Sequence, residues 1–238
     1  MGLTGVIRHS VVIPAFNAVR HVGEAIGSAR AQLGPDDELI VVDNGSTDGT
    51  LDVLAPLAAN GGIQLLHETK RGPAAARNRG MREARGRIIS FLDADDLWPA
   101  GRQDGMIDCL DADASADAVY GRISVTFDAM PEGRLAAERV RFLPIEGTHA
   151  PLIGLGIYTF RRELLERTGE QNEAIMMGED TDYLLRLRAA GMNCATYGGL
   201  ALVYRRHERN MTRDPKDVGA ATMGLILRGL RRRRGEND

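Results

Sequence analysis

Three carboxylates stand within four residues at positions 93 to 96, where Asp-Ala-Asp-Asp directly follows an apolar run. Side chains two residues apart on an extended chain point the same way, so Asp93 and Asp95 can face one side about 6–7 Å apart. Like charges at that spacing need a compensating cation, and Mg²⁺ or Mn²⁺ takes such carboxylates together with substrate phosphates. The alternative is that Asp95 or Asp96 caps a helix beginning near Pro99.

A polar turn, Asp43 to Gly49, follows a second apolar run. Asp43 can accept a hydrogen bond from the N–H of a nucleobase, and the glycines beside Ser46 let a ligand approach the backbone closely. Asp48 resembles a helix N-cap. The turn indicates either a nucleoside site or an ordinary turn ahead of a helix.

The stretch Gly72 to Gly80 opens a helix, and a helix N-terminus favours a phosphate or a carboxylate. Arg77 and Asn78 can reach a ligand from this helix, or they can hold the acidic loop 93–96 in place. Lys70 and Arg71 precede it and can reach a diphosphate. An ordinary amphipathic helix with alanine packing explains the same stretch about equally well.

Two further candidates lie in the second half of the chain. Asp180 follows Gly178 and Glu179 at the start of an expected helix. It can take a proton from a hydroxyl if it faces the same edge as the other motifs, and otherwise these acids are caps. His207 follows an expected last strand and is a metal ligand only if the chain returns to the acidic cluster.

The apolar periodicity supplies elements that would bring these motifs together. We expect strands at 10–14, 38–42, 63–66 and 87–92, and helices at 20–33, 50–59 and 73–84. This alternation is typical of a parallel sheet with helices on both faces, which binds ligands at the carboxyl ends of its strands. In the second half we expect strands at 118–127, 138–143 and 155–160, and helices at 161–168 and 180–190.

The bulk composition is that of a soluble globular protein. The chain has 238 residues, 43% hydrophobic and 26% charged, and its net charge of −3 favours no nucleic-acid partner. Two cysteines without metal-type spacing and an N-terminus without a signal sequence predict a cytoplasmic location. Residues 219–238 are basic and end near four arginines, so they are either a solvated tail or a weak contact to an anionic membrane at the inner face.

The order and spacing of VVIPAFNA, VVDNGSTDGT, GPAAARNRG, FLDADDLW and GED resemble the family 2 glycosyltransferases, which use nucleotide sugars and have the GT-A fold. The match is close over the first hundred residues and looser to about His207. It implies one Rossmann-like, mostly parallel α/β domain over 1–218, with a nucleotide-sugar-binding half (1–100) and an acceptor or catalytic half (101–218).

The resemblance also implies roles for single residues. The donor-binding positions would be Pro14, Ala15, Phe16, Asn17, Asp43, Ser46, Arg71, Arg77, Asn78, Asp93, Ala94 and Asp95. Among them Asp43 would bind the base, and Asp93 and Asp95 the ribose and the metal-bound diphosphate. Asp180 would be the catalytic base. His207 would join Asp93 and Asp95 on Mn²⁺ or Mg²⁺, as in some relatives.

The implied reaction is inverting transfer of a sugar from a nucleoside diphosphate sugar, with uridine the expected base. The acceptor is open: a glycan, a lipid-linked sugar, a small molecule or a peptide, recognised through a loop near 128–151. A late Gln-x-x-Arg-Trp pattern is missing, which favours transfer of one or a few sugars. The alternatives are a sugar-nucleotide-binding domain without turnover, a nucleotidyltransferase, which would usually carry a glycine-rich basic loop after the first strand, and a membrane-surface module.

Overall fold

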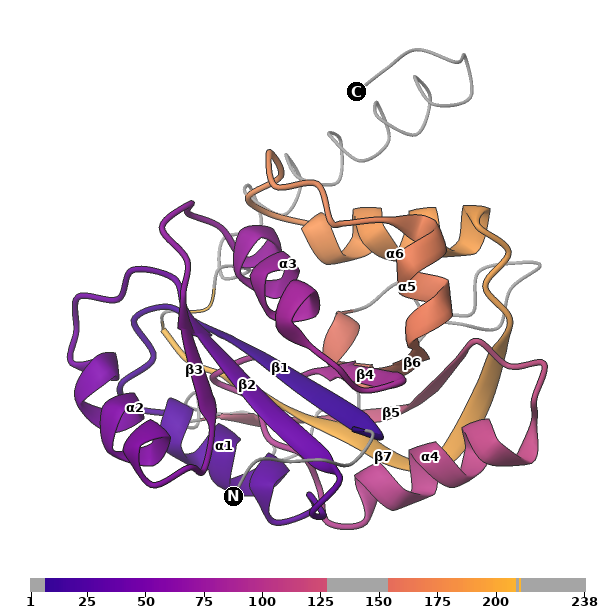
Figure 1. The fold of residues 1–238 in the computed structure, drawn as a ribbon, viewed down its shortest axis with the longest axis horizontal. Coiled ribbons are helices and arrows are strands. Elements are labelled where there is room, and N and C mark those ends of the chain that lie inside the picture. The colour runs from indigo at the N-terminus through magenta and orange to yellow at the C-terminus, as the bar shows by residue number, and fades with distance from the viewer. Residues whose placement is uncertain (1–6, 128–153, 209, 211–238) are drawn as a thin grey trace, which may run out of the picture.

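Seven strands form one sheet in the part of the chain that the structure describes. The computed structural model describes residues 7–127, 154–208 and 210. The strands are β1 (His9–Ala15), β2 (Asp37–Asp43), β3 (Gln64–His67), β4 (Ile88–Phe91), β5 (Ala118–Phe127), β6 (Tyr158–Arg161) and β7 (Cys194–Arg206). Their order is β3-β2-β1-β4-β6-β5-β7, and of these seven only β6 runs antiparallel to its neighbours (Figure 1). The sheet is mostly parallel, as predicted.

Helices cover both faces of this sheet. They are α1 (Val22–Arg30), α2 (Thr50–Ala59), α3 (Pro73–Glu83), α4 (Arg102–Ala112), α5 (Arg162–Thr168), α6 (Glu179–Ala189) and the short η1 (Leu155–Ile157). Figure 1 shows α1, α2 and α4 on one face and α3, α5 and α6 on the other. Central strands are therefore apolar on both sides, as the full burial of Val11, Val12 and Ile13 in β1 shows. Among the described helices, none combines the length and apolarity that a membrane crossing requires.

The structure confirms most expected elements and corrects some boundaries. The first four strands and three helices lie within a few residues of their predicted positions, although the helix expected at 20–33 covers only Val22–Arg30. The strand expected at 155–160 is η1 followed by β6. The strand expected at 138–143, the acceptor loop near 128–151 and the tail 219–238 lie outside the described residues.

A buried arginine fastens α4 to the second half of the sheet. Arg102, the first residue of α4, is fully buried and stacks over the Trp98 ring, with 4.0 Å between Cζ and the ring centroid. Its guanidinium donates hydrogen bonds to the carbonyl oxygens of Tyr158 (2.8 Å) and Ala201 (3.2 Å). Burial lowers the pKa of Arg102 to about 9. These contacts hold α4 against β6 and β7 and so support the second half of the sheet.

The packing of α3 on β1 gives a prediction about stability. A Cβ atom on Gly80 would lie 2.3 Å from Cγ1 of Val12, whose β-branched side chain has little freedom in a strand. We expect Gly80→Ala to lower the free energy of unfolding by about 1–3 kcal/mol. Gly27 in α1 has no atom within 4 Å of the same position, so Gly27→Ala should be neutral or stabilising by up to about 1 kcal/mol. Urea denaturation of both variants tests this difference, and equal effects would contradict it.

Candidate active site

Three polar loops meet at the carboxyl edge of the sheet. In the register of β1 and β2, Ala15 lies opposite Asp43, and β4 on the other side of β1 ends at Phe91 opposite Val12. The loops that follow these strands contain Phe16 and Asn17, the turn after Asp43, and the acidic loop 93–96. The predicted convergence of these motifs on one edge is therefore confirmed at the level of the backbone.

The loops after β1 and β2 are bonded to each other. The backbone N–H of Asn17 donates to Oγ of Ser46 (3.0 Å), and the backbone N–H of Thr47 donates to Oδ1 of Asn17 (2.8 Å). Asn17 has a φ of 49°, a left-handed conformation that asparagine tolerates better than most residues. Asn17 and Ser46 thus shape this part of the edge together.

Asp43 is buried and organises its own turn. Its carboxylate accepts hydrogen bonds from the backbone N–H groups of Gly45 (3.2 Å) and Ser46 (3.3 Å). Its contact to a nucleobase stays a prediction. Asp48 accepts from the N–H of Thr50 (3.1 Å), so it caps the first turn of α2 from one position before the N-cap, which is Gly49.

Asn44 is a positioning residue that the sequence analysis missed. Its Nδ2 donates to the carbonyl oxygens of Glu68 (3.0 Å) and Lys70 (2.8 Å), and its Oδ1 accepts from the N–H of Gly72 (2.9 Å). These bonds hold the donor loop, which we define as residues 68–72, against the turn after β2. The sequence feature that could have identified Asn44 is its amide side chain directly after Asp43, the aspartate predicted to bind the base.

Phe16 and Arg71 form an exposed pair at the same edge. The Phe16 side chain is 46% exposed, which is high for a large apolar group, and Cζ of Arg71 lies 5.2 Å from the centroid of its ring. Pro14 is half-buried, while Ala15 and Ala94 are buried. Phe16 and Arg71 therefore offer side chains to a ligand, whereas the two alanines allow close packing of the backbone.

Arg77 connects the acidic loop to the start of α6. One guanidinium nitrogen lies 2.7 Å from Oδ1 of Asp93 and another lies 2.8 Å from Oε1 of Glu179. Burial by itself would lower the pKa of Arg77, but the charges of Asp93 and Glu179 outweigh it and raise that pKa above its ordinary value. Arg77 thus remains a cation that pins the acidic loop, one of the two roles predicted for it.

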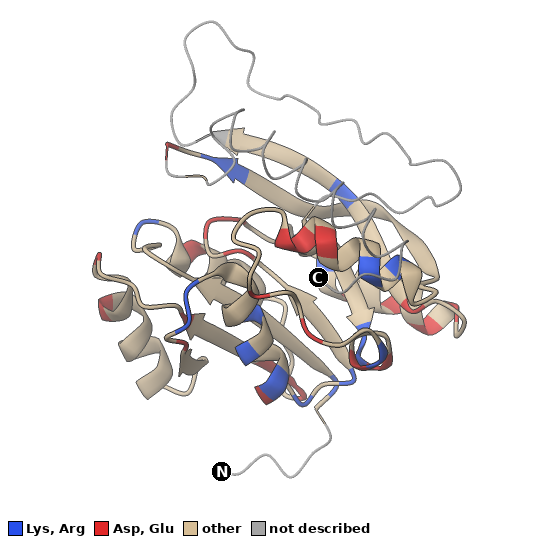
Figure 2. Ribbon diagram, turned by 90° about the horizontal axis from the view of Figure 1, so that it is seen from above, with Lys and Arg blue, Asp and Glu red and all other residues tan. Residues whose placement is uncertain are grey.

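Asp180 follows Glu179 in the first turn of α6. Figure 2 shows this helix with acidic residues in its first turn and basic residues in its last, the arrangement that the helix dipole favours. The half-buried Asp180 accepts a hydrogen bond from the N–H of Thr181 (2.8 Å). Burial raises its pKa, and the charge of Arg77 partly offsets the rise. A carboxylate of raised basicity beside the acidic loop can accept a proton.

His207 returns to the acidic loop from the end of β7. Its Nε2 lies 3.0 Å from Oδ2 of Asp95, and its ring stacks on that of His21 with centroids 4.9 Å apart. Burial and the charge of Asp93 raise the pKa of Asp95. The sequence analysis allowed His207 as a metal ligand only if it lay close to the acidic loop, and the structure places it there.

Asp96 does not cap the following helix, which corrects the capping alternative. The helix α4 begins only at Arg102, with Gly101 as N-cap. Asp96 is buried and accepts a hydrogen bond from the N–H of Arg205 (2.8 Å). Burial raises its pKa well above the ordinary value. The hydrogen bond to Arg205 holds the end of β7, and with it the adjacent His207, beside the acidic loop.

Asn78 was predicted to contact the donor, and the structure assigns its amide elsewhere. The side chain is fully buried. Its Nδ2 donates to the carbonyl oxygen of Gln171 (3.0 Å) and to Oε1 of Glu173 (2.9 Å), and its Oδ1 accepts from the N–H of Gln171 (2.9 Å). These bonds attach α3 to the segment that contains Gln171 and Glu173, so Asn78 has a structural role there.

The residues present fit a hard divalent cation that shares its shell with a ligand. The side chains of Asp93 and Asp95 are 40% and 30% exposed, so both carboxylates can be reached. Within the described residues, no group of three or more His, Cys, Asp or Glu side chains is arranged to enclose a metal. Mg²⁺ and Mn²⁺ commonly use one or two carboxylates plus phosphate oxygens and water. Asp93 and Asp95 supply two such carboxylates, and His207 lies beside Asp95.

The chain is similar to proteins of one family. The sequence model of Glycosyl transferase family 2 matches residues 10–169. The succinoglycan biosynthesis protein ExoO of Rhizobium meliloti is 29% identical over 215 residues, which are 85% of this chain. This chain spans 62% of the length of ExoO, and 15% to 52% of three other curated relatives that it matches.

Two solved structures show the fold. S. aureus TarS 1–349 in complex with UDP-GlcNAc has a TM-score of 0.72 at 18% identity, and the match covers 92% of this chain and 66% of the TarS 1–349 chain. The mannosyltransferase PcManGT from Pyrobaculum calidifontis, in complex with GDP-Man and Mn²⁺, has a TM-score of 0.70 at 24% identity, covering 96% and 65%. The predicted GT-A fold is confirmed by these likenesses.

Proposed function

Since this chain belongs to Glycosyl transferase family 2, we propose that it transfers a sugar from a nucleoside diphosphate sugar to an acceptor nucleophile, with inversion at the anomeric carbon. The observation that carries the proposal is the bridge formed by Arg77. It ties Asp93 in the acidic loop to Glu179, the neighbour of Asp180. A donor held at the loop is thereby placed near a candidate base.

The chain's own residues have separate tasks in this reaction. Asp43 and Phe16, at the carboxyl ends of β2 and β1, bind the nucleoside end of the donor, and Arg71, beside Phe16, reaches the diphosphate. Asp180 accepts the proton of the acceptor hydroxyl while that oxygen forms its bond to the anomeric carbon. The bond between this carbon and the diphosphate oxygen breaks, and the nucleoside diphosphate leaves. A positioned base of this kind contributes about 10²–10⁴-fold to the rate.

Asp93 and Asp95 would hold the divalent cation together with oxygens of the donor diphosphate, and His207 lies beside Asp95. When bound, such an ion neutralises negative charge on the leaving diphosphate. PcManGT was solved with GDP-Man and Mn²⁺, which supports a cation beside a nucleotide sugar, and TarS was solved with UDP-GlcNAc, which supports the donor class. Uridine remains the preferred base and guanosine the next candidate. The acceptor, the cytoplasmic location and any membrane contact of residues 219–238 stay predictions.

The experiment is a panel of nucleotide sugars incubated with the protein and Mn²⁺, with release of free sugar measured in the absence of an acceptor. We expect slow hydrolysis of one donor class above the rate in buffer. Binding without any turnover, even in extracts that supply acceptors, would favour a non-catalytic binding domain. Release of pyrophosphate from a nucleoside triphosphate and a sugar phosphate would favour a nucleotidyltransferase.

A further inference from the structure

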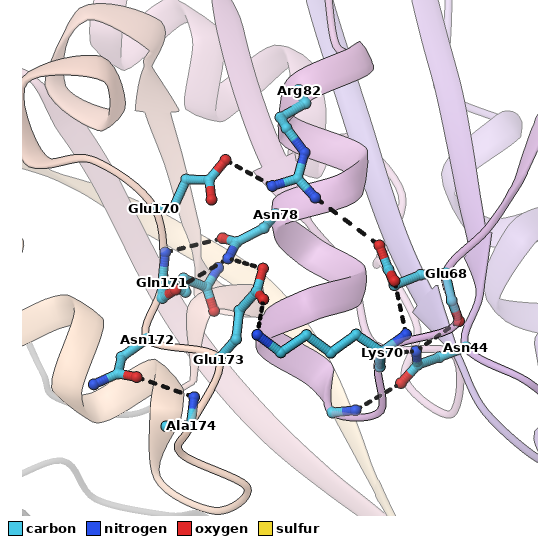
Figure 3. Close-up of polar contacts among 11 residues, drawn as sticks. Asn44, Glu68, Lys70, Asn78, Arg82, Glu170, Gln171, Asn172, Glu173 and Ala174 are labelled. Carbon is cyan, nitrogen blue, oxygen red and sulfur yellow. Dashed lines mark hydrogen bonds and ion pairs between the residues drawn. The ribbon is translucent and has the colours of Figure 1, made fainter.

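A polar network joins the donor loop to the segment that leads into α6. Residues 169–178, here called the connecting segment, link the end of α5 to the start of α6. Figure 3 shows this segment lying along α3: Asn78 reaches from α3 to the segment, and Lys70 extends from the donor loop to Glu173. The side-chain amide of Asn78 bonds both the backbone N–H and the backbone carbonyl oxygen of Gln171, which fixes the segment there.

Glu173 stands at the centre of this network. Its Oε1 accepts from Nδ2 of Asn78 (2.9 Å), and its Oε2 lies 2.6 Å from Nζ of Lys70 in the donor loop. These two donors lower the pKa of Glu173, so it is ionised at neutral pH. The side chain is only 19% exposed, while that of Lys70 is 63% exposed.

A second contact reinforces the first. Gly72 has a φ of 123°, and a Cβ atom there would lie 3.1 Å from Sδ of Met176. A larger residue at position 72 would therefore be strained and would push against Met176. Met176 lies four residues before Asp180 in the connecting segment. The donor loop thus lies against the connecting segment at Met176 as well as at Glu173.

The two partners of the ion pair are held unequally. The donor loop has independent support, because Asn44 bonds its backbone at Glu68, Lys70 and Gly72. Besides its bonds to Asn78, the connecting segment is held to α3 and the donor loop by Glu170, Glu173 and Met176. Loss of the ion pair should therefore displace the connecting segment more than the donor loop.

We propose that Glu173 is a positioning residue that sets the place of Asp180 relative to the donor by clamping the connecting segment to Lys70. The proposal rests on the proposed function, because it takes Asp180 as the base. Small displacements of a reacting group cost up to about 10²-fold in rate. Loss of the clamp therefore affects kcat, while donor affinity follows the donor loop and stays nearly unchanged.

The test compares two glutamates of the connecting segment: Glu173 pairs with Lys70 of the donor loop, and Glu170 pairs with Arg82 of α3. Glu173→Gln keeps an acceptor for Asn78 but removes the ion pair with Lys70. Glu170→Gln removes the more exposed pair of Glu170 with Arg82 (2.8 Å), which lies farther along the chain from Asp180. We expect Glu173→Gln to lower kcat by about 10-fold with the donor Kd changed less than about 3-fold, and Glu170→Gln to change neither. Equal effects of the two variants would overturn the proposal.

A charge exchange separates positioning from simple destabilisation. Lys70→Glu and Glu173→Lys each bring like charges together, and the double variant restores an ion pair of opposite polarity. Its kcat should exceed that of either single variant by at least about 3-fold. A double variant no better than the worse single one would contradict a clamp.

Amide hydrogen exchange tests the clamp without any assay of turnover. In Glu173→Gln, peptides covering residues 174–181 should exchange faster than in the parent protein, while peptides from α3 should not. Unchanged exchange in 174–181 would overturn the inference even if the protein transfers sugar. If the parent protein binds no nucleotide sugar, the proposed function fails, and the exchange result still decides whether Glu173 holds the segment.

Discussion

Replacing Asp180 with asparagine is expected to lower kcat by about 10²–10⁴-fold, the usual contribution of a positioned base. Asparagine has the same shape and keeps an oxygen for the N–H of Thr181, but it cannot take a proton at neutral pH. The donor Kd should change little, because the proposed donor contacts lie in other loops. Initial rates with the best donor, together with calorimetry of donor binding, measure both quantities.

The thermal midpoint serves as the control for Asp180→Asn. Since Asp180 is half-buried and its pKa is raised by burial, loss of its charge should not destabilise the fold, and the midpoint should hold or rise. Full turnover in the variant would show that Asp180 is only part of the helix start. A collapse of donor binding would place Asp180 in the donor site instead.

Replacing Arg77 with methionine is expected to lower the free energy of unfolding by about 3–5 kcal/mol, the usual cost of leaving a buried ion without its partner. The Glu179 side chain is only 8% exposed, and Arg77 is its charged partner at 2.8 Å. Asp93 loses the same guanidinium. Urea denaturation of the purified variant measures the change.

Arg79 provides a matched control on the same helix. Its ion pair with Glu83 is exposed on both sides, so Arg79→Met should cost less than about 1 kcal/mol. Adding Glu179→Gln to Arg77→Met should restore part of the lost stability, because it removes the stranded charge. Similar losses for Arg77→Met and Arg79→Met would contradict the bridging role.

The first half of the fold could be predicted because its signals are local. Apolar runs ending in polar turns mark β1, β2 and β4, and a proline at the first turn marks α3. Strand direction is not a local property, so the antiparallel placement of β6 between β4 and β5 could not be read. Arg102 donates to the carbonyl oxygen of Tyr158 in this strand, but its sequence neighbourhood is that of a surface helix although its side chain is fully buried.

Long-range pairs explain what was missed at the candidate site. Asp95 and His207 are 112 residues apart, and Asn78 and Glu173 are 95 apart. The spacing of residues in the sequence does not predict whether side chains so far apart in the chain lie in contact. Residue type was also ambiguous for Asp96, because an aspartate after a strand reads as a cap, whereas here it is buried against the backbone of Arg205.

The most direct test of a cation-dependent nucleotide-sugar site is calorimetric titration of the preferred donor into the parent protein and into Asp95→Ala, each with Mn²⁺ and with EDTA. Binding by the parent protein in Mn²⁺, its loss in EDTA, and weak binding by Asp95→Ala under both conditions are the results that the account predicts. Equal donor affinity in all four titrations would contradict it, because the carboxylates of the acidic loop would then have no part in holding the ligand.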